Sequence, residues 1–306
     1  MITEEKVLIK VNDKAMKNCD NYKKTYNYEV SGDKILIENI ADFNIRHILE
    51  CGQVFRFKQL SQMQWSVYSA DKYAQVNNYA NYVEIVTDDV DYFINYFDLH
   101  SDYTQIKRHL IECGKSEMLL AAIDYGYGIR ILRQNLNESI FSFIISANNN
   151  IKRIQLIIDR LCCEIGEKTL YGYAFPTLEA LACQNEAFYS KIGCGYRARY
   201  MTITANLIKN GALDGIENMN TAMACKQLKE LYGVGQKVAD CILLFGMHKG
   251  DVFPADVWIK RVYHAAFEQG DDDKNISAAL VKRFGSFSGY AQQYLFYYGR
   301  ENALKA

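Results

Sequence analysis

Residues 231–241 read L-Y-G-V-G-Q-K-V-A-D-C, and F-P-A-D follows at residues 253–256. Gly233 and Gly235 can turn the backbone tightly and leave N–H groups pointing outward, as an anion-binding concavity requires. Lys237 stands where we expect the next helix to begin, although the positive end of a helix dipole disfavours a cation by about 0.3–1 kcal/mol. The same field favours the neutral amine, which is the nucleophilic form of a lysine. The stretch therefore predicts a turn, a helix start and a candidate nucleophile.

The sequence on either side of the glycines predicts a helix–hairpin–helix over about residues 221–246. An amphipathic segment precedes the turn, and an apolar helix follows it. Outward N–H groups at Gly233, Val234 and Gly235, together with the helix N-terminus, suit a DNA phosphate. A plain helical hairpin would also contain paired glycines, so the turn alone leaves both interpretations open.

Two further residues suit chemistry on a sugar. Cys241 lies four residues after Lys237 and therefore on the same helix face. Asp256 precedes a helical run at residues 257–263, as an N-cap does, and N–H bonds to its carboxylate would keep the pKa low. An ionised carboxylate beside a nucleophilic amine can stabilise positive charge that develops on a sugar. Simpler roles stay open: a solvated lysine, a small core cysteine and a plain helix cap.

Length and composition indicate an ordinary globular protein. The 306 residues can form two or three modest domains, and 49% hydrophobic with 23% charged residues is typical of that class. No apolar run reaches the roughly 18 residues that a membrane span needs, so we expect no membrane partner. The opening residues, M-I-T-E-E-K, lack the basic and apolar regions of a signal peptide. These features favour a cytoplasmic protein.

Cysteine and histidine usage predicts neither a metal site nor a redox cofactor. The nine cysteines include no C-x-x-C pair, and their odd number argues against a disulfide framework. The five histidines lack metal-ligand spacing. Four clustered cysteines do not follow Cys241, so the ligand count excludes a C-terminal iron–sulfur cluster.

Charge is distributed unevenly behind a formal net charge of −1. Residues 61–125 hold 4 Lys and Arg against 10 Asp and Glu, whereas residues 191–261 hold 10 against 6. A basic later part suits a protein that turns one face to a polyanion. Random scatter of surface charge would also produce such a difference, so charge by itself only hints at a nucleic acid.

Apolar patterning divides the chain into a β part and a helical part. Alternating or β-branched segments predict strands at residues 34–37, 53–57, 64–68 and 82–86. From about residue 88 the period becomes helical. An apolar helix over 138–145 runs into three asparagines that would stop it, and another helix starts at residue 151. We expect an α+β fold, with an N-terminal antiparallel sheet domain and flanking helices over residues 1–125 and a helical body over residues 126–306.

Five segments in the same order resemble the helix–hairpin–helix DNA glycosylases, and in particular the 8-oxoguanine DNA glycosylase/AP lyases. One is the hairpin motif with its P-x-D sequel. The others are C-G-Q-V-F-R-F at 51–57, the run from Ile129 to Ile151, G-Y-R-A-R-Y at 195–200 and G-Y-A-Q-Q-Y-L-F at 289–296. Together they cover roughly residues 50–300. The resemblance implies that the helical body has the HhH-GPD fold.

The resemblance assigns catalysis to two residues. Lys237 would attack C1′ of the deoxyribose, expel the damaged base, form a Schiff base and nick the strand by β-elimination. Asp256 would stay ionised and stabilise the oxocarbenium-like sugar. Because a base inside a duplex is out of reach, the nucleotide must be flipped into a pocket.

The resemblance also assigns recognition of the damaged base. Gly52 would supply a backbone carbonyl to 8-oxoguanine, which carries a hydrogen on N7 where guanine presents a lone pair. Glycine would allow the close approach that such a main-chain test needs. Gln292 would read the Watson–Crick edge, while Phe296 would stack on one face of the base and Cys241 on the other.

Four residues match positions that fill the vacated space and read the opposite cytosine in the family. They are Asn148, Arg153 and Arg197, with Tyr196 as a wedge beside them. A simpler interpretation is that these basic and aromatic groups only grip phosphate. Relatives also bind a cation through backbone carbonyls under the hairpin, so a structural cation there is an open expectation.

The sequence departs from the family at three positions. Trp258 stands where many relatives carry a histidine that contacts the DNA backbone, which puts that contact in doubt. Tyr232 replaces the usual hairpin proline and loosens the preset φ of the turn. Cys51 replaces a serine beside Gly52, with little expected consequence. The first ~30 residues match nothing in the family.

The motifs together predict a bifunctional glycosylase that removes 8-oxoguanine opposite cytosine from double-stranded DNA. We expect a bacterial-like, monomeric enzyme that requires no cofactor. One alternative is a helix–hairpin–helix glycosylase for another oxidised or alkylated base, and Gly52, Gln292 and Phe296 argue against it. The other is a non-catalytic DNA-binding module, which would need neither Lys237 nor Asp256.

Overall fold

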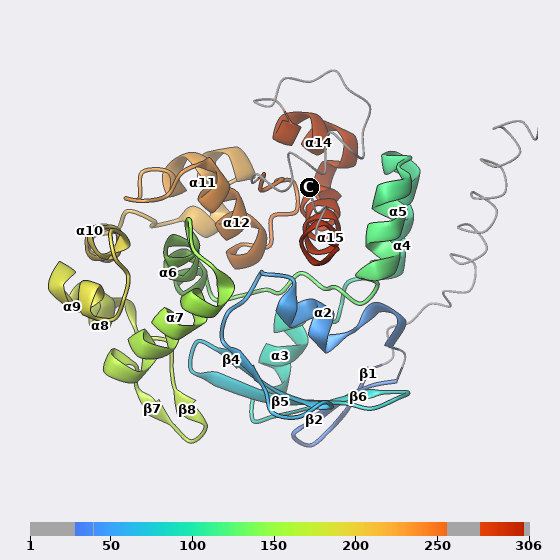
Figure 1. Ribbon diagram of the computed structural model, residues 1–306, viewed down its shortest axis with the longest axis horizontal. Helices are drawn as coiled ribbons and strands as arrows, with labels where there is room; N and C mark the ends of the chain where they lie inside the picture. The colour runs from blue at the N-terminus through green and yellow to red at the C-terminus, as the bar shows by residue number, and fades with distance from the viewer. Residues whose placement is uncertain (1–27, 39, 256–275, 303–306) are drawn as a thin grey trace, which may run out of the picture.

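The computed structural model describes residues 28–38, 40–255 and 276–302. A six-stranded antiparallel sheet forms the N-terminal part, in the order β1-β2-β6-β5-β4-β3. Its strands are β1 (Tyr28–Ser31), β2 (Lys34–Ile37), β3 (Phe57–Gln59), β4 (Gln64–Ser69), β5 (Lys72–Asn78) and β6 (Val83–Thr87). Figure 1 shows this sheet on one side of the molecule, with the helices stacked over it. The expected antiparallel sheet followed by helices is therefore confirmed.

Alternation along the strands explains why one face of the sheet is buried. Trp65 pairs with Val76 and Val67 with Ala74 across β4 and β5, and all four side chains are buried. Such directly opposed apolar pairs are what stabilise a sheet. Helices α2 (Ile45–Glu50) and α3 (Val90–Tyr96) supply further apolar residues to the core of the sheet. The strands predicted at 34–37, 64–68 and 82–86 match β2, β4 and β6 within one residue.

The strand predicted over residues 53–57 is wrong for most of its length. Only Phe57 belongs to a strand, and residues 53–56 form an irregular link after α2. Gln53 is fully buried, and its side chain hydrogen-bonds to the backbone. Its Nε2 donates to the carbonyls of Ile48 and Arg130, at 2.9 and 2.7 Å. These bonds to two separate segments replace the ladder that a strand would form, so the β-like composition was misleading.

The rest of the described chain is mainly helical. Six helices that follow α5 in sequence lie on one side of the molecule: α6 (Leu136–Ser146), α7 (Ile151–Ile165), α8 (Leu178–Ala182), α9 (Glu186–Lys191), α10 (Arg197–Lys209) and α11 (Thr221–Leu228). Helix α12 (Gln236–Gly246) packs between them, and β7 (Lys168–Thr169) with β8 (Gly172–Tyr173) forms a small hairpin. A second group contains α4 (Tyr103–Gly114), α5 (Glu117–Tyr125), α14 (Ile276–Phe284) and α15 (Ser288–Glu301). Figure 1 shows α5 and α15 side by side although they are distant in sequence.

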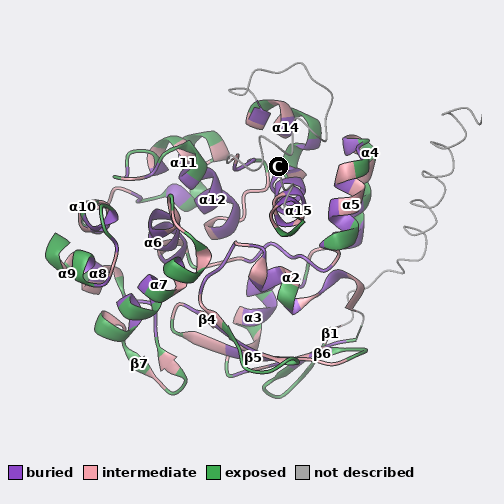
Figure 2. Cartoon of the chain, in the orientation of Figure 1, coloured by how far each residue is buried: buried purple, intermediate pink, exposed green. Residues whose placement is uncertain are grey.

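Two hydrophobic cores divide the described chain near residue 100. The core of the sheet ends at Leu99, apart from Leu132, and the core of the helices lies from Tyr103 onward, apart from Cys51 and Phe55. Figure 2 shows buried residues where the sheet faces α2 and α3 and between the helices. The expected boundary between residues 125 and 126 lies later in the chain than this division and stays a prediction.

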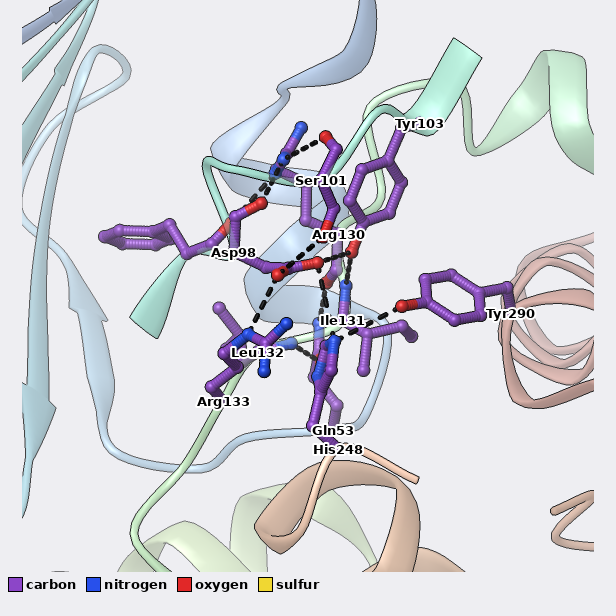
Figure 3. Close-up of polar contacts among 11 residues, drawn as sticks. Gln53, Asp98, Ser101, Tyr103, Arg130, Ile131, Leu132, Arg133, His248 and Tyr290 are labelled. Atoms are coloured by element: carbon purple, nitrogen blue, oxygen red, sulfur yellow. Dashed lines mark hydrogen bonds and ion pairs between the residues drawn. The ribbon is translucent and has the colours of Figure 1, made fainter. Parts of the chain in front are cut away.

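A buried polar network joins the sheet domain to the helices. The Asp98 carboxylate is 1% exposed and accepts from Ser101 Oγ at 2.8 Å, Tyr103 OH at 3.1 Å and Arg133 Nε at 2.8 Å. His248 Nε2 lies 3.5 Å from the same carboxylate, on the segment that follows α12 (Figure 3). A buried carboxylate with several partners restricts the segments that supply them. The network therefore holds the segment after α12 against the sheet domain.

Two general properties follow from the described residues. None of the helices in these ranges combines the length and apolar character that a membrane crossing requires. The eight cysteines in the same ranges form no disulfide with one another.

Candidate active site

The hairpin between α11 and α12 requires a glycine at position 233. Gly233 has φ +88°, a region that L side chains rarely adopt. A Cβ there would stand 2.6 Å from the ring of Tyr200 on α10, so no side chain fits without movement. Thr204, on the same helix, donates to the carbonyl of Tyr232 at 2.8 Å. Helix α10 thus packs against the hairpin and restricts its conformation.

Gly235 serves a different purpose from Gly233. Its φ of −89° and ψ of −177° are extended values open to any residue, and no atom lies within 4 Å of where its Cβ would stand. It is the N-cap of α12 and has no side chain with which to cap the helix. The first N–H groups of a helix lack intrahelical partners. Gly235 therefore leaves the positive end of α12 accessible.

Val234 does not present its N–H outward as predicted. That N–H donates to the carbonyl of Leu231 at 3.2 Å, and the side chain is buried. The residue therefore closes the turn and anchors it in the core, because a backbone donor used inside the turn is not available to a phosphate.

Lys237 and Cys241 lie on α12, one turn apart. Lys237 is the second residue of the helix, one position later than expected, and is exposed, whereas Cys241 is 4% exposed. Helix α12 therefore begins at the surface near Lys237 and enters the apolar interior at Cys241. Asp256, the proposed partner of Lys237, and Trp258 lie outside the described residues.

Asp240 carries a buried carboxylate on α12 and was not among the predicted site residues. Burial raises the pKa of Asp240 to about 6, even though Gln236 Nε2 donates to it at 2.8 Å. An acidic residue at an otherwise apolar helix position could have drawn attention to it. Asp240 lies three residues after Lys237 and next to Cys241, so its charge acts close to both candidate site residues.

Gly52 ends α2 and lies directly against Phe296. Cys51 is the C-cap of α2, and Gly52 follows it with φ +86°, the left-handed geometry that commonly terminates a helix. A Cβ on Gly52 would stand 3.1 Å from Cε1 of Phe296 and 3.3 Å from Nη1 of Arg300. The structure therefore brings two of the predicted recognition residues, Gly52 and Phe296, into contact, and the close approach of a base to Gly52 stays a prediction.

Helices α12 and α15 approach each other where Leu244 meets Gly289. A Cβ on Gly289 would stand 2.3 Å from Cδ1 of Leu244, so a side chain there would require the leucine to shift. Cys241 and Gln292 each lie three residues from this contact, about one helical turn. Cys241 belongs to the hydrophobic core of the helices, and the partly buried Phe296 packs against that core.

Gln292 carries an unused polar atom. The residue is 5% exposed, and its Oε1 is inaccessible and has no hydrogen-bond partner within the described ranges. A buried amide oxygen without a partner costs free energy, commonly about 1–3 kcal/mol. Such a cost is typical of a group reserved for a ligand rather than for the fold.

The four residues predicted to face the opposite base gather around the turn between α6 and α7. Asn148 has φ +49° and is exposed, and Tyr196 is 55% exposed with its hydroxyl donating to the Ala147 carbonyl at 3.3 Å. Arg153 is exposed and donates to the Gly193 carbonyl at 3.4 Å.

Arg197 differs from its neighbours because it is 3% exposed. Its guanidinium donates to the carbonyls of Ala147 and Asn148, the latter at 2.7 Å, and stacks over the Tyr196 ring at 4.4 Å. Arg197 therefore holds the asparagine turn in place, and contact with an opposite base would require it to exchange these bonds.

Within the described ranges, no three His, Cys, Asp or Glu side chains are grouped so that they could hold an ion. A cavity of about 440 Å³ lies elsewhere, between β3, β4 and α7, with Phe57, Tyr68 and Leu156 among its walls. It includes none of the predicted site residues.

Comparison with known protein families assigns both parts of the chain. Residues 35–140 match the family model of the 8-oxoguanine DNA glycosylase N-terminal domain, and residues 141–285 match that of the HhH-GPD superfamily of base excision DNA repair proteins. The 8-oxoguanine glycosylase/lyase of Clostridium acetobutylicum, solved with DNA containing cytosine opposite 8-oxoG, is 35% identical with a TM-score of 0.85. The match covers 92% of this chain and 100% of that chain. The chain belongs to the 8-oxoguanine DNA glycosylase family.

Curated members of the 8-oxoguanine DNA glycosylase family match over a shorter length. An N-glycosylase/DNA lyase of Saccharomyces cerevisiae is 32% identical over 211 residues, and one of Arabidopsis thaliana is 33% identical over 187 residues. Each match covers 55% of this chain, and it covers 56% of the yeast protein and 51% of the plant protein. The chain thus spans about half the length of these two family members.

Proposed function

We propose that the protein is a bifunctional DNA glycosylase that excises 8-oxoguanine opposite cytosine and nicks the strand through a Schiff base on Lys237. Family membership supports this activity, and so does the Clostridium acetobutylicum relative, whose solved complex contains cytosine opposite 8-oxoG. The proposal places the enzyme on double-stranded DNA in the cytoplasm, acting as a monomer. It requires no cofactor, because an amine and a carboxylate supply the chemistry.

The arrangement around Gly52 is the observation that carries the proposal. Gly52 has φ +86° and touches Phe296, and Gln292 on the same helix as Phe296 holds a buried amide oxygen with no partner in the described ranges. A backbone carbonyl at Gly52 would accept from N7–H of 8-oxoguanine and repel the N7 lone pair of guanine. Gln292 would read the Watson–Crick edge while Phe296 stacks on the purine.

The proposed reaction starts at the accessible amine of Lys237. Its lone pair attacks C1′, and the bond from C1′ to N9 breaks with its electron pair leaving on the purine, which takes up a proton. Loss of a proton from the amine and opening of the sugar give the Schiff base. Removal of a C2′ proton then expels the 3′ phosphate. Asp256, held ionised, would stabilise the positive charge on the sugar during the first step.

Phosphate binding and the opposite base belong to other residues in the proposal. The accessible N-terminus of α12 behind Gly235 would bind a DNA phosphate. Asn148, Arg153, Tyr196 and Arg197 would fill the vacated stack and face the cytosine. Excision measured across all four opposite bases tests this part, and we expect the fastest turnover opposite cytosine. Equal rates with every opposite base would remove these four residues from base discrimination.

Covalent trapping tests the central claim. Borohydride should reduce the Schiff base and trap an adduct between the protein and an 8-oxoguanine duplex, and Lys237→Gln should abolish it. An adduct that persists in Lys237→Gln would refute the assignment of the nucleophile. A non-catalytic module would retard the duplex without nicking it, and a glycosylase for another lesion would excise 8-oxoguanine no faster than guanine.

The role of Asp256 has its own test. Asp256→Asn should keep the affinity for DNA and lose most single-turnover excision, because the amide cannot balance a developing positive charge. Wild-type rates in this variant would remove Asp256 from the mechanism.

A further inference from the structure

The two backbone carbonyls that precede Gly52 are both bound by side chains of α15. Gln293 Nε2 donates to the carbonyl of Cys51 at 2.6 Å, and Arg300 Nη2 donates to the carbonyl of Glu50. Carbonyls in the last turn of a helix lack intrahelical partners. The end of α2 is therefore capped by a helix that lies more than 200 residues away in sequence.

Both donors are held in place by their surroundings. Gln293 is 2% exposed, which is uncommon for a glutamine. The Arg300 guanidinium carbon lies 5.7 Å from the ring centroids of Phe296 and Tyr297, and its Nε donates to Glu301 at 3.0 Å. Nη1 of Arg300 is inaccessible, has no partner within the described ranges and lies 3.3 Å from where a Gly52 Cβ would stand. The Arg300 guanidinium thus packs directly against Gly52.

The spacing of these residues ties them to the base pocket. Positions 293, 296 and 300 recur at intervals of three and four, so Gln293, Phe296 and Arg300 share one face of α15. Gln292 is the adjacent residue. Helix α15 carries the candidate base readers Gln292 and Phe296. It therefore also binds the end of α2 beside Gly52, which is the third candidate. A reading carbonyl discriminates well only when its position is held to within about 0.5 Å.

We propose that Gln293 and Arg300 are positioning residues that set the Gly52 carbonyl against the flipped purine and so determine discrimination between 8-oxoguanine and guanine. The inference rests on the proposed function. Neither residue needs to contact DNA, since each acts through the carbonyls of Cys51 and Glu50. The tilt of the following peptide, and hence the direction of the Gly52 carbonyl, depends on both bonds.

Equilibrium binding to three duplexes tests the proposal. All variants are made in the Lys237→Gln background, so that no chemistry follows binding. The duplexes pair cytosine with 8-oxoguanine, with guanine or with a tetrahydrofuran abasic analogue. For Gln293→Met and Arg300→Met we expect the preference for 8-oxoguanine over guanine to fall about tenfold or more, as when a hydrogen-bond reader is lost. Affinity for the abasic duplex should stay within about twofold, because it offers no base to read.

Matched controls separate positioning from general effects. Arg160→Met removes another guanidinium that donates to a backbone carbonyl, that of Ile192 at 3.3 Å, and Gln184→Met removes another amide that donates to a carbonyl, that of Ala180. Neither should change the 8-oxoguanine-to-guanine ratio. Arg300→Lys keeps the charge with a single donor group and should restore part of the preference. Gln293→Asn shortens the same amide by one methylene and tests the bond again should Gln293→Met not fold.

Two results would overturn the inference. One is an unchanged 8-oxoguanine-to-guanine ratio in folded variants of both residues. The other is an equal loss of affinity for all three duplexes, which would indicate a merely structural role. Failure of the proposed function is visible separately, because Lys237→Gln with Gln293 and Arg300 intact would then show no preference for 8-oxoguanine at all.

Discussion

The guanidinium of Arg197 donates a 2.7 Å hydrogen bond to the backbone carbonyl of Asn148 and is almost completely buried. Asn148 adopts φ +49°, a left-handed conformation that asparagine tolerates better than most residues. The arginine therefore holds the turn in this conformation, while the Asn148 side chain remains exposed and can reach a partner.

Arg197→Lys tests this relationship. A lysine keeps the charge but lacks the planar fork that reaches several carbonyls at once, so we expect the free energy of unfolding to fall by about 1–3 kcal/mol. Urea denaturation measures the change, and the exposed Arg199→Lys serves as the control with a change below about 0.5 kcal/mol. If both variants unfold at the same urea concentration as the unmodified protein, Arg197 does not support the turn.

The two hairpin glycines should respond differently to alanine. Gly233→Ala places a Cβ at positive φ and against Tyr200, so it should destabilise the fold by at least about 1–2 kcal/mol. Gly235→Ala meets neither obstacle and should keep the thermal stability of the unmodified protein. Its methyl group would nevertheless obstruct the N-terminus of α12 and weaken binding to damaged and undamaged duplexes alike. Thermal unfolding with DNA titration measures both. Unimpaired DNA binding by Gly235→Ala would show that no phosphate sits there.

Asp240 should make stability depend on pH. Burial raises the folded-state pKa to about 6 from 3.8, so the folded state holds its proton more tightly than the unfolded chain. Stability from this group is therefore present at low pH and declines as pH rises through 6. Asp240→Asn should stabilise the protein by at most about 3 kcal/mol at pH 8 and about half as much at pH 5. An equal gain at both pH values would contradict the assignment.

The Arg56–Glu138 ion pair should be a main link between the sheet domain and α6. The atoms lie 3.1 Å apart, and the two side chains are 8% and 5% exposed. Glu138→Gln leaves a buried guanidinium without a counter-charge and should cost about 3–5 kcal/mol in unfolding free energy. Lys58 and Asp159 also join the sheet to a helix, but both are more than half exposed. Asp159→Asn should therefore cost less than about 1 kcal/mol, and an equal cost for both variants would refute the distinction.

Local sequence predicted much of the fold because local rules govern it. The alternation in residues 64–68 and 82–86 produced β4 and β6, since side chains on a strand point to opposite faces. The helix–hairpin–helix expected over about 221–246 appears as α11 and α12, with Gly233 in the left-handed geometry that paired glycines indicate.

The failures arose where distant segments decide the conformation. Residues 53–56 have β-like composition, but Gln53 bonds to Ile48 and Arg130 instead of forming a ladder. No local feature of the sequence indicated that Gln293 caps α2. Arg197 was expected to read the opposite cytosine or to grip phosphate, and only the tertiary structure shows that it is buried against the Ala147 carbonyl.

The sequence by itself determined the order of sheet and helices, the hairpin and the identity of the candidate reactive residues, because glycine geometry, periodicity and side-chain chemistry are local properties. Tertiary structure decided the contact of Gly52 with Phe296, the burial of Arg197 and the hydrogen bonding of α15 to the end of α2. These depend on helix packing between segments far apart in the chain, and the free energy of such packing is a property of pairs of surfaces rather than of any one stretch.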